Sequence, residues 1–326
     1  PSSTLVFDRD GQLLRAFTAA DDSWRIRTSY DQISPVLRKF LIAYEDQSFY
    51  WHQGFNPLAI IRAYRQNKKS GRIVSGGSTI TMQIARMMEP KSRTWFHKVI
   101  EVGRAVQLEQ RYSKRRLLEI YFNIAPYGGN IEGVAAASWL YFGKEPTRLS
   151  YGEAALLAAL PNSPTWLRPD VHPERARQAR DKVLNIVYQK GIISKREYEE
   201  ALAEAIPGAR QELPFLAPQF CWEMITKYPG QPRIFTTLKL RNQQLAETLL
   251  RDYLKGLAVQ GITNGAVVII DNKSKELLAA VGSGDFFNKT AQGQVNGYRA
   301  PRSPGSALKP FVYGLGFENG VITPQH

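Results

Sequence analysis

The chain has 326 residues, which is more than one ordinary hydrophobic core organises and enough for two domains. Lys and Arg outnumber Asp and Glu by 43 to 29, and the net charge of +14 favours anionic partners such as nucleic acid, phosphorylated substrates or an anionic membrane. Cys221 is the only cysteine, so an intrachain disulfide is excluded. No apolar run of 18 residues could span a bilayer, and because the chain begins with Pro1 we expect a fragment whose signal or anchor segment has been removed.

The first expected element is a β-hairpin. Hydrophobic residues alternate through residues 4–18 on either side of Asp10-Gly11, a dipeptide typical of a tight turn. Ser34 and Pro35 then open a helix, as its capping residue and its first helical residue. The apolar stripe of this helix consists of Leu37, Phe40, Leu41 and Tyr44. The helix is expected to end at Glu45.

From there to about residue 205 the pattern is mainly helical. Pro161 ends one of the later helices and Gly191 ends another. The expected helices cover residues 98–112, 114–122, 151–160, 174–190 and 194–205. The proline-rich stretch 206–218 is typical of a linker.

After residue 230 strand and helix patterns alternate, which indicates an α/β domain. We expect a strand at 233–238, a helix at 240–257, a buried strand at 266–270 and a second strand at 276–282. The chain is therefore divided into an N-terminal β-hairpin and connector (1–29), a mainly α-helical domain (30–205), an interdomain linker (206–262) and the incomplete start of an α/β domain (263–326).

The segment from Glu45 to Gly54, EDQSFYWHQG, combines two carboxylates at a helix end with several aromatic residues. Aromatic walls remove water from a carboxylate and raise its pKa toward that of a useful base, so this segment could border an active site. A solvated helix end explains the same residues, and it is the better interpretation of this segment taken alone.

A glycine-rich loop, Ser75-Gly76-Gly77-Ser78-Thr79, precedes the next helical segment. Its glycines open the backbone, Ser78 can cap the helix, and backbone N–H groups at a helix start can hold phosphate oxygens. An ordinary capped helix is the alternative interpretation. The neighbouring run 60–75 contains Arg and Lys without any acid, which a solvated helix face does not readily explain.

Glu119 and Asn123 lie four residues apart and therefore share one helical face. From the residues alone, we favour their role as structural partners that hold neighbouring helices together over a contact with a ligand.

Together these segments resemble the family 51 glycosyltransferases, the peptidoglycan polymerase domains of class A penicillin-binding proteins. The five motifs of that family occur here in order. EDxxFxxHxG is matched from Glu45 to Gly54, GGSTxTQQ from Gly76 to Gln83, RKxxE at Lys98 and Glu101, KxxxLExYxN from Lys114 to Asn123, and RRxxVL at Arg180, Val183 and Leu184. The sequence departs from these motifs at Met82, His97 and Ala179.

A second resemblance lies near the C-terminus. Residues 302–311, RSPGSALKPF, resemble the SxxK box of serine acyltransferases that bind penicillin. Ser306 and Lys309 are three residues apart on one helical face, where the amine can activate the hydroxyl as a nucleophile. The later SxN and KTG boxes of that family do not follow, so this domain is expected to be incomplete.

The resemblance implies a lysozyme-like, mainly α fold that polymerises lipid II into a β-1,4 glycan and releases polyprenyl pyrophosphate. Glu45 would be the general base on the acceptor 4-hydroxyl. Glu101 would support the pyrophosphate by orienting Lys98 or, with Glu45, by holding a divalent metal such as Mg²⁺ or Mn²⁺; no organic cofactor is implied. Ser306 and Lys309 would be catalytic in the complete acyltransferase domain. The implied substrate-binding residues are Asp46, Phe49, His52, Ser78, Thr79, Gln83, Arg86, Lys98, Glu119, Asn123 and Arg180.

The same resemblance implies lipid II and the growing glycan as partners, moenomycin and β-lactams as inhibitors, other cell-wall synthesis proteins as further partners, and no nucleic acid. It implies a place at the bacterial inner membrane, with one N-terminal anchor outside this chain and catalytic domains facing the periplasm. Apolar and basic residues mix in 55–75 and again around Met87, Met88, Trp95 and Phe96, as expected at a lipid headgroup boundary. An ordinary core is the alternative for these apolar residues.

Three other functions compete with a polymerase. A lysozyme-like glycan hydrolase also uses one key glutamate, but it has no use for a cationic, glycine-rich loop. A nucleic-acid-binding module would suit the charge but lacks a recognised sequence signature. A cell-wall scaffold that has lost activity would explain the departures at Met82, His97 and Ala179.

Overall fold

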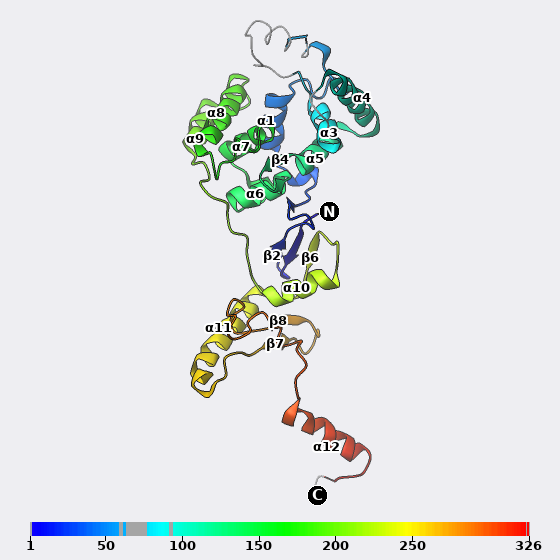
Figure 1. Cartoon of the computed structure of the whole chain (residues 1–326), viewed down its shortest axis with the longest axis vertical. Helices are drawn as coiled ribbons and strands as arrows, with labels where there is room; N and C mark the ends of the chain where they lie inside the picture. The colour runs from blue at the N-terminus through cyan, green and yellow to red at the C-terminus, as the bar shows by residue number, and fades with distance from the viewer. Residues whose placement is uncertain (1, 59–60, 63–76, 91–93, 324, 326) are drawn as a thin grey trace. The chain divides into compact units, whose positions relative to one another are not determined.

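The computed structural model describes residues 2–58, 61–62, 77–90, 94–323 and 325, apart from the side chain of Trp95. The chain divides into two compact units (Figure 1). Unit 1 consists of Pro1–Phe7, Leu13–Leu216 and Met224–Phe235, and unit 2 of Asp8–Gln12, Ala217–Glu223 and Thr236–His326. Gly76 and most of the basic run at 60–75 lie outside the described residues.

Unit 1 begins with the predicted hairpin. Strands β1 (Thr4–Phe7) and β2 (Leu13–Phe17) are antiparallel. Strand β6 (Arg233–Phe235) pairs in parallel with the other edge of β1, which gives the sheet order β2-β1-β6. The predicted hairpin and the predicted strand after residue 230 are therefore both confirmed, although the strand joins the sheet of the N-terminal hairpin.

The helices of unit 1 begin where the sequence provides caps. Ser34 accepts the backbone N–H of Val36, and Ser150 and Ser194 each form a capping box with a glutamate three residues later. The helices of this unit include α1 (Pro35–Glu45), α3 (Ile80–Met88), α4 (Trp95–Arg111), α5 (Lys114–Ile124), α6 (Val134–Phe142), α7 (Tyr151–Ala159), α8 (Pro173–Gln189) and α9 (Lys195–Ala203). α4 begins earlier than predicted because Thr94 caps it.

Short elements connect these helices. They are the 3-10 helices η1 (Tyr30–Gln32), η2 (Pro146–Arg148) and η3 (Leu160–Asn162), and the strands β3 (Trp24–Arg25), β4 (Pro126–Gly128) and β5 (Ile131–Glu132). The strands form a small sheet in the order β3-β5-β4. Helix α10 (Pro218–Lys227) follows the proline-rich stretch and contains the buried thiol of Cys221.

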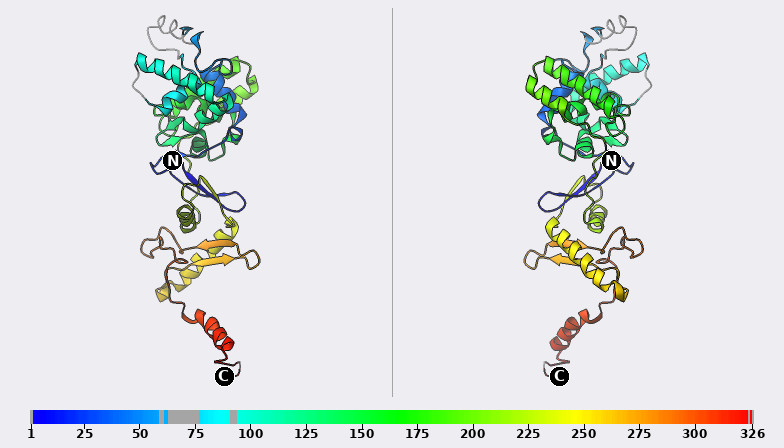
Figure 2. Two further views of the ribbon diagram at one scale, coloured as in Figure 1. Left: turned by 90° about the vertical axis from the view of Figure 1, so that its right-hand side faces the viewer. Right: turned by 90° about the vertical axis from the view of Figure 1, so that its left-hand side faces the viewer.

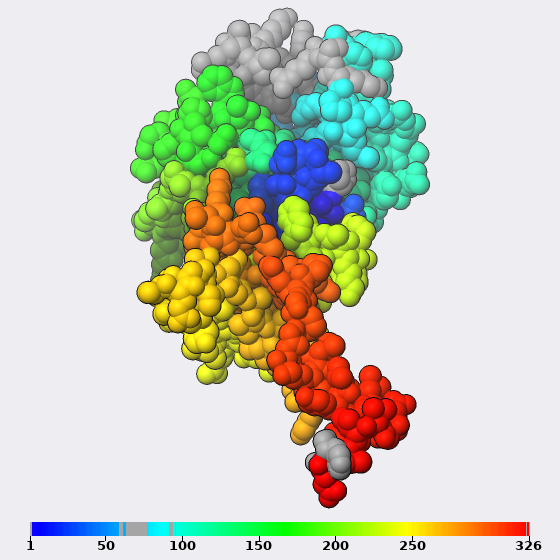
Figure 3. All heavy atoms as spheres, turned by 60° about the horizontal axis from the view of Figure 1, so that its bottom comes forward, coloured from blue at the N-terminus to red at the C-terminus, as the bar shows by residue number. Residues whose placement is uncertain are grey.

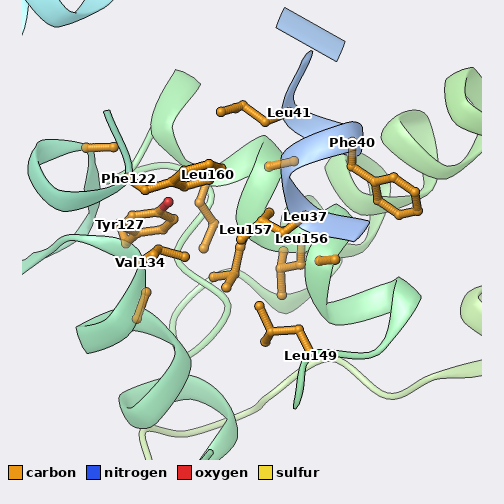
Figure 4. Packing of buried hydrophobic residues seen from close by; sticks show 14 of the residues in the cluster. Leu37, Phe40, Leu41, Phe122, Tyr127, Val134, Leu149, Leu156, Leu157 and Leu160 are labelled. Atoms are coloured by element: carbon orange, nitrogen blue, oxygen red, sulfur yellow. The ribbon is translucent and has the colours of Figure 1, made fainter. Parts of the chain in front are cut away.

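Helix α7 lies at the centre of the core of unit 1. Its sequence, YGEAALLAA, is apolar on almost every side, and such a helix is stable only when it is surrounded by protein. Leu37, Phe40 and Leu41 of α1 belong to the same buried cluster as Leu156 and Leu157 of α7 (Figure 4). Since α1 packs directly on α7, the position of its C-terminal end is fixed by the core.

Unit 2 is built from one long helix and a two-stranded ribbon. Helix α11 (Leu240–Leu257) places Ala246, Leu250 and Leu254 against β8 (Leu277–Val281), which pairs antiparallel with β7 (Val267–Ile270) (Figure 2). The sequence pattern predicts that α11 belongs to the linker at 206–262, whereas in the structure it forms part of the core of unit 2. A single turn η4 (Ala258–Gln260) follows α11.

Strand β7 differs from the expectation of a buried strand. Val268 and Ile270 are 46% and 54% exposed, because only one face of the ribbon is covered by α11. Farther along, η5 (Gly305–Leu308) leads into α12 (Lys309–Glu318), whose side chains are exposed almost throughout (Figure 3). Within the described part of the chain, no helix is both long enough and apolar enough to cross a bilayer.

Gly54 provides a test of how tightly the loop after α1 packs on α4. Its φ is +97°, and a Cβ atom there would lie 2.7 Å from the backbone carbon of Ala105. We expect Gly54→Ala to lower the free energy of unfolding by about 3 kcal/mol, through strain and overpacking together. Gly191→Ala is the matched control: its φ is +67° with nothing within 4 Å, so about 1 kcal/mol is expected. Equal decreases in the free energy of unfolding of the two variants, measured by urea unfolding, would contradict the close approach of Gly54 to Ala105.

Candidate active site

Three elements meet at the carboxylate of Glu45, the last residue of α1. Gln83 of α3 donates from Nε2 to Oε2 at 2.7 Å. Asn162 of η3 donates from Nδ2 to Oε1 at 2.5 Å. Both oxygens of the carboxylate therefore accept a hydrogen bond from an uncharged side-chain amide, and each keeps further lone-pair capacity for a substrate.

The surroundings of Glu45 make its carboxylate more basic than usual. Burial is the largest influence and raises the pKa of Glu45, and the neighbouring charge of Asp46 raises it further. The hydrogen bonds from Gln83 and Asn162 and the positive charge of Arg86 lower the pKa without cancelling the effect of burial. A carboxylate in this setting can accept a proton from a hydroxyl group more readily than one in water.

Asp46, the next residue, has a different set of partners. It is 6% exposed and accepts hydrogen bonds from the backbone N–H of Ile80 at 3.0 Å and from His52 Nε2 at 2.9 Å. His52 Nδ1 in turn accepts the backbone N–H of Gly54, so the ring proton lies on Nε2. These contacts join the loop 46–54 to the first turn of α3. We call this set of contacts, made by Asp46, His52, Gly54 and Ile80, the clamp.

Phe49 lies inside this clamp rather than at a surface that a substrate could contact. Its side chain is fully buried, and the ammonium of Lys114 lies 4.6 Å from the centre of its ring. Lys114 also donates to the carbonyl of His52 and to Glu109. The prediction that Phe49 binds substrate is corrected by its burial, since the ring is part of the core.

The start of α3 also differs from the prediction. Thr79, not Ser78, caps the helix by accepting the N–H of Met82, and its hydroxyl donates to the carbonyl of Gly54. The N–H of Ile80 is taken by Asp46. Because protein groups occupy these two N–H groups, the backbone at this helix start is less available to phosphate than the sequence suggested.

A lysine remains near that helix start. Lys98 of α4 donates from Nζ to the hydroxyl of Ser78 at 2.6 Å and to Glu101 Oε1 at 2.9 Å. The side chain of Lys98 is 41% exposed, whereas that of Glu101 is 11% exposed. Glu101 therefore fixes an ammonium group that still faces solvent. Arg86 is also exposed, one helical turn after Gln83 on α3. Two cations thus belong to this part of unit 1: Lys98, held by Ser78, and Arg86, which lies on the helix that carries Gln83.

Glu119 and Asn123 of α5 make structural contacts in place of the predicted substrate contact. Glu119 accepts the backbone N–H of Tyr30, and the amide of Asn123 bonds both the N–H and the carbonyl of Thr28. Within α5, Arg116 donates to Glu119, and Asn123 donates to the carbonyl of Glu119. Among the described residues, the other hydrogen bonds of the two side chains go to the segment before α1, and none reaches the carboxylate of Glu45. This agrees with the structural interpretation of the i, i+4 pair.

Arg180 is likewise a structural residue. It is 2% exposed and donates to the carbonyls of Leu202 and Glu204 at the end of α9. A buried guanidinium that closes a helix end is not available to a substrate, so its predicted role in substrate binding is corrected. Met82, where the family motif has Gln, is fully buried as well, and this departure falls in the core.

The predicted divalent metal at Glu45 and Glu101 has no preformed set of ligands. In the parts of the chain that are described, no group of three or more His, Cys, Asp or Glu side chains could hold an ion. The oxygens of Glu45 accept amide hydrogen bonds, and Glu101 is paired with Lys98. Both carboxylates therefore already have hydrogen-bond partners, and the divalent metal stays a prediction.

Ser306 and Lys309 lie in unit 2, in η5 and at the first position of α12. Both side chains are exposed. Their roles as nucleophile and base stay predictions.

The sequence pattern did not indicate Asn162 as a site residue, because Pro161 predicts only the end of a helix there. The signal that could have found it is a short amide side chain between Pro161 and Pro164, directly after an apolar helix. Prolines on both sides restrict the backbone and hold such a side chain in one place.

Comparison with known proteins shows the family to which the chain belongs. The transglycosylase family model matches residues 10–188. The chain belongs to the transglycosylase family. The model of the penicillin-binding protein transpeptidase domain matches residues 265–326, so the two domains occur in the order of class A penicillin-binding proteins, as the resemblance predicted.

The relatives compared with this chain are longer than it is. It is 42% identical to penicillin-binding protein 1C of Escherichia coli over 98% of its own length and 41% of that protein, and 35% identical to penicillin-binding protein 1A of Aquifex aeolicus over 79% and 36%. Within the family, Met82 and the RSPGSALKPF segment together resemble the 1C proteins most. A crystal structure of penicillin-binding protein 1A from Haemophilus influenzae is 21% identical with a TM-score of 0.38, over 79% of this chain and 30% of that one. The transglycosylase chain thus spans less than half the length of these relatives.

The clamp around Asp46 predicts a loss of stability on removal of its charge. In Asp46→Asn, an amide N–H₂ group replaces one carboxylate oxygen and faces a buried N–H donor. We therefore expect the free energy of unfolding to fall by about 2–3 kcal/mol. Asp31→Asn, whose side chain is 72% exposed in the same unit, should change it by less than about 1 kcal/mol. Comparable denaturant midpoints for the two variants would count against the clamp.

Proposed function

We propose that unit 1 polymerises lipid II, a disaccharide-peptide carried on a polyprenyl pyrophosphate, into β-1,4 glycan strands. One observation carries the proposal above the others: Glu45 combines a raised pKa with two amide donors that orient its carboxylate. A base that must remove a proton from a sugar hydroxyl needs both properties. Family membership and the exposed cations near α3 support the same substrate class.

In the proposed reaction Glu45 removes the proton of the acceptor 4-hydroxyl while that oxygen attacks the anomeric carbon of the donor. The new bond joins this oxygen to the anomeric carbon, and the bond from the anomeric carbon to the pyrophosphate oxygen breaks. The configuration inverts in this single displacement. The proton stays on Glu45 until solvent takes it, and the electron pair leaves on the pyrophosphate.

The leaving pyrophosphate carries negative charge, so cations on its side lower the barrier. Lys98 is suited to this role because Ser78 and Glu101 fix its ammonium while its side chain stays partly exposed. Arg86 is the second cation. Thr79 holds the start of α3, the helix that carries Arg86, and Gln83 holds the carboxylate of Glu45. In this proposal Glu101 is a positioning residue for Lys98.

The proposal includes a membrane surface, because the substrate is a lipid. Leu58, Met88 and Phe96 are 79%, 57% and 68% exposed, in segments that also carry Arg62 and Arg86. Exposed apolar side chains beside cations suit the headgroup region of an anionic membrane. In this proposal the surface lies on the bacterial inner membrane, and the catalytic units face the periplasm.

The activity of unit 2 belongs to the proposal for the whole protein. Ser306 would attack a peptide or β-lactam carbonyl, with Lys309 as base, once a complete acyltransferase domain surrounds them. Inhibition of the polymerase by moenomycin, inhibition of acyl transfer by β-lactams, and contacts with other cell-wall synthesis proteins are part of the same proposal.

Glu45→Gln should abolish polymerisation without weakening the fold. We expect glycan synthesis from lipid II to fall by about 100-fold or more, because the variant lacks the base. Burial favours the proton-bound form of Glu45 in the folded state, so stability from this group decreases as pH rises through its raised pKa. The neutral variant should therefore be no less stable than the parent at neutral pH. Polymer formation near the parent rate would refute Glu45 as the base.

The pH dependence of the parent gives a second test. Activity should be lost as pH falls through the pKa of Glu45, and the midpoint of this acidic limb should lie above the usual range of glutamate because burial raises that pKa. The measurement is kcat/KM for lipid II against pH, with folding followed in parallel. A limb at or below the usual glutamate range would contradict the base assignment.

Membrane binding can be tested apart from catalysis. We expect Met88→Ser combined with Phe96→Ser to weaken co-sedimentation with phosphatidylglycerol vesicles by about tenfold or more, since two apolar side chains no longer enter the bilayer. Val171→Ser combined with Ile192→Ser removes two exposed apolar side chains elsewhere in unit 1 and should leave binding unchanged. Binding that is equally strong on uncharged vesicles would refute the electrostatic part.

A further inference from the structure

The amide of Asn162 lies on the open side of the Glu45 carboxylate. Gln83, which holds one oxygen, is 7% exposed, whereas Asn162, which holds the other, is exposed. The two donors lie at 2.7 and 2.5 Å from different oxygens. Hydrogen bonds to two different oxygens fix the plane of a carboxylate, which one bond alone does not do.

The inner of the two amides is itself held by a tyrosine. The hydroxyl of Tyr121, a buried side chain, donates to Oε1 of Gln83 at 3.4 Å. The outer amide also acts on Tyr44, the residue that precedes Glu45 in α1. Burial and the charge of Glu45 raise the pKa of Tyr44, and the side chain of Asn162 opposes them.

The backbone around Asn162 is rigid and fixes the position of its side chain. Residue 162 ends η3, which follows α7 without a break, and nearly all of α7 is buried in the core. The N–H of Ser163 bonds the carbonyl of Leu160, and the N–H of Leu167 bonds that of Ser163. With Pro161 and Pro164 on either side, little conformational freedom is left for the amide to lose when it binds the carboxylate.

We infer that Asn162 is a positioning residue for the general base: it holds Glu45 on the side from which the acceptor hydroxyl approaches. The inference rests on the proposed function for its kinetic consequences. It assigns to Asn162 two effects on Glu45, since the amide fixes the direction of the free lone pairs and stabilises the ionised carboxylate that must accept the proton.

The first variant is Asn162→Ala in the full chain. A hydrogen bond to a charged group is lost, so we expect kcat for lipid II polymerisation to fall by about tenfold or more with little change in KM. The acidic limb of the pH profile should move to higher pH, because the ionised form has lost a donor. Asn162→Gln keeps the amide and should retain more activity than Asn162→Ala. Asn185→Ala, an exposed asparagine of α8 in the same unit, should match the parent.

The second measurement does not depend on polymerisation. Side-chain carboxyl ¹³C NMR, with the Glu45 signal assigned through Glu45→Gln, gives the pKa of Glu45 in each variant. We expect this pKa to rise in Asn162→Ala and to be unchanged in Asn185→Ala. A rise in a chain that makes no polymer would support the positioning role while the proposed function fails. An unchanged pKa and pH profile in Asn162→Ala, whether kcat falls or not, would overturn the inference.

Discussion

The burial of one carboxylate at the end of α1 is the constraint on which the rest of unit 1 depends. Helix α1 packs onto α7 through Leu37, Phe40 and Leu41. Helix α7 stays buried in the core because it is apolar on almost every side. The end of α1 is thereby held where Glu45 loses much of its water. A buried charge is tolerated only if hydrogen bonds replace the lost hydration, and the amides of Gln83 and Asn162 supply them.

Glu45 and Asp46 show how adjacent carboxylates acquire different chemistry from their partners alone. Asp46 faces a backbone N–H and the ring N–H of His52, which satisfy it within the protein and make it part of the scaffold. Glu45 faces two neutral amides that leave lone pairs free, and burial raises its pKa. The same logic of two acids with separate environments underlies many sites where one carboxylate handles protons and its neighbour does not.

The limits of prediction from sequence follow from the range of each interaction. α1, α7 and the N-terminal hairpin were predictable because caps, prolines and turn residues act within a few positions of the chain. Asn162 was not, since its partner Glu45 lies 117 residues away and no local pattern records that contact. Arg180 was assigned to substrate because a motif shows which residues recur together, not whether a guanidinium faces a ligand or, as here, the carbonyls of α9. For β7, an apolar run could not show that only one face of the strand is covered.

A raised glutamate pKa suits a glycan hydrolase as well as a polymerase, so the base alone does not separate the two reactions. The leaving group does. A hydrolase expels a sugar hydroxyl and must protonate it, a step that a carboxyl group of raised pKa performs and that a cation beside the leaving group does not assist. A polymerase expels a pyrophosphate, which needs cations and no proton. The cations near α3 are therefore the feature that favours the proposed polymerase. Lys98, oriented by Ser78 and Glu101, is a cation of the kind that the departing pyrophosphate of the proposed reaction requires.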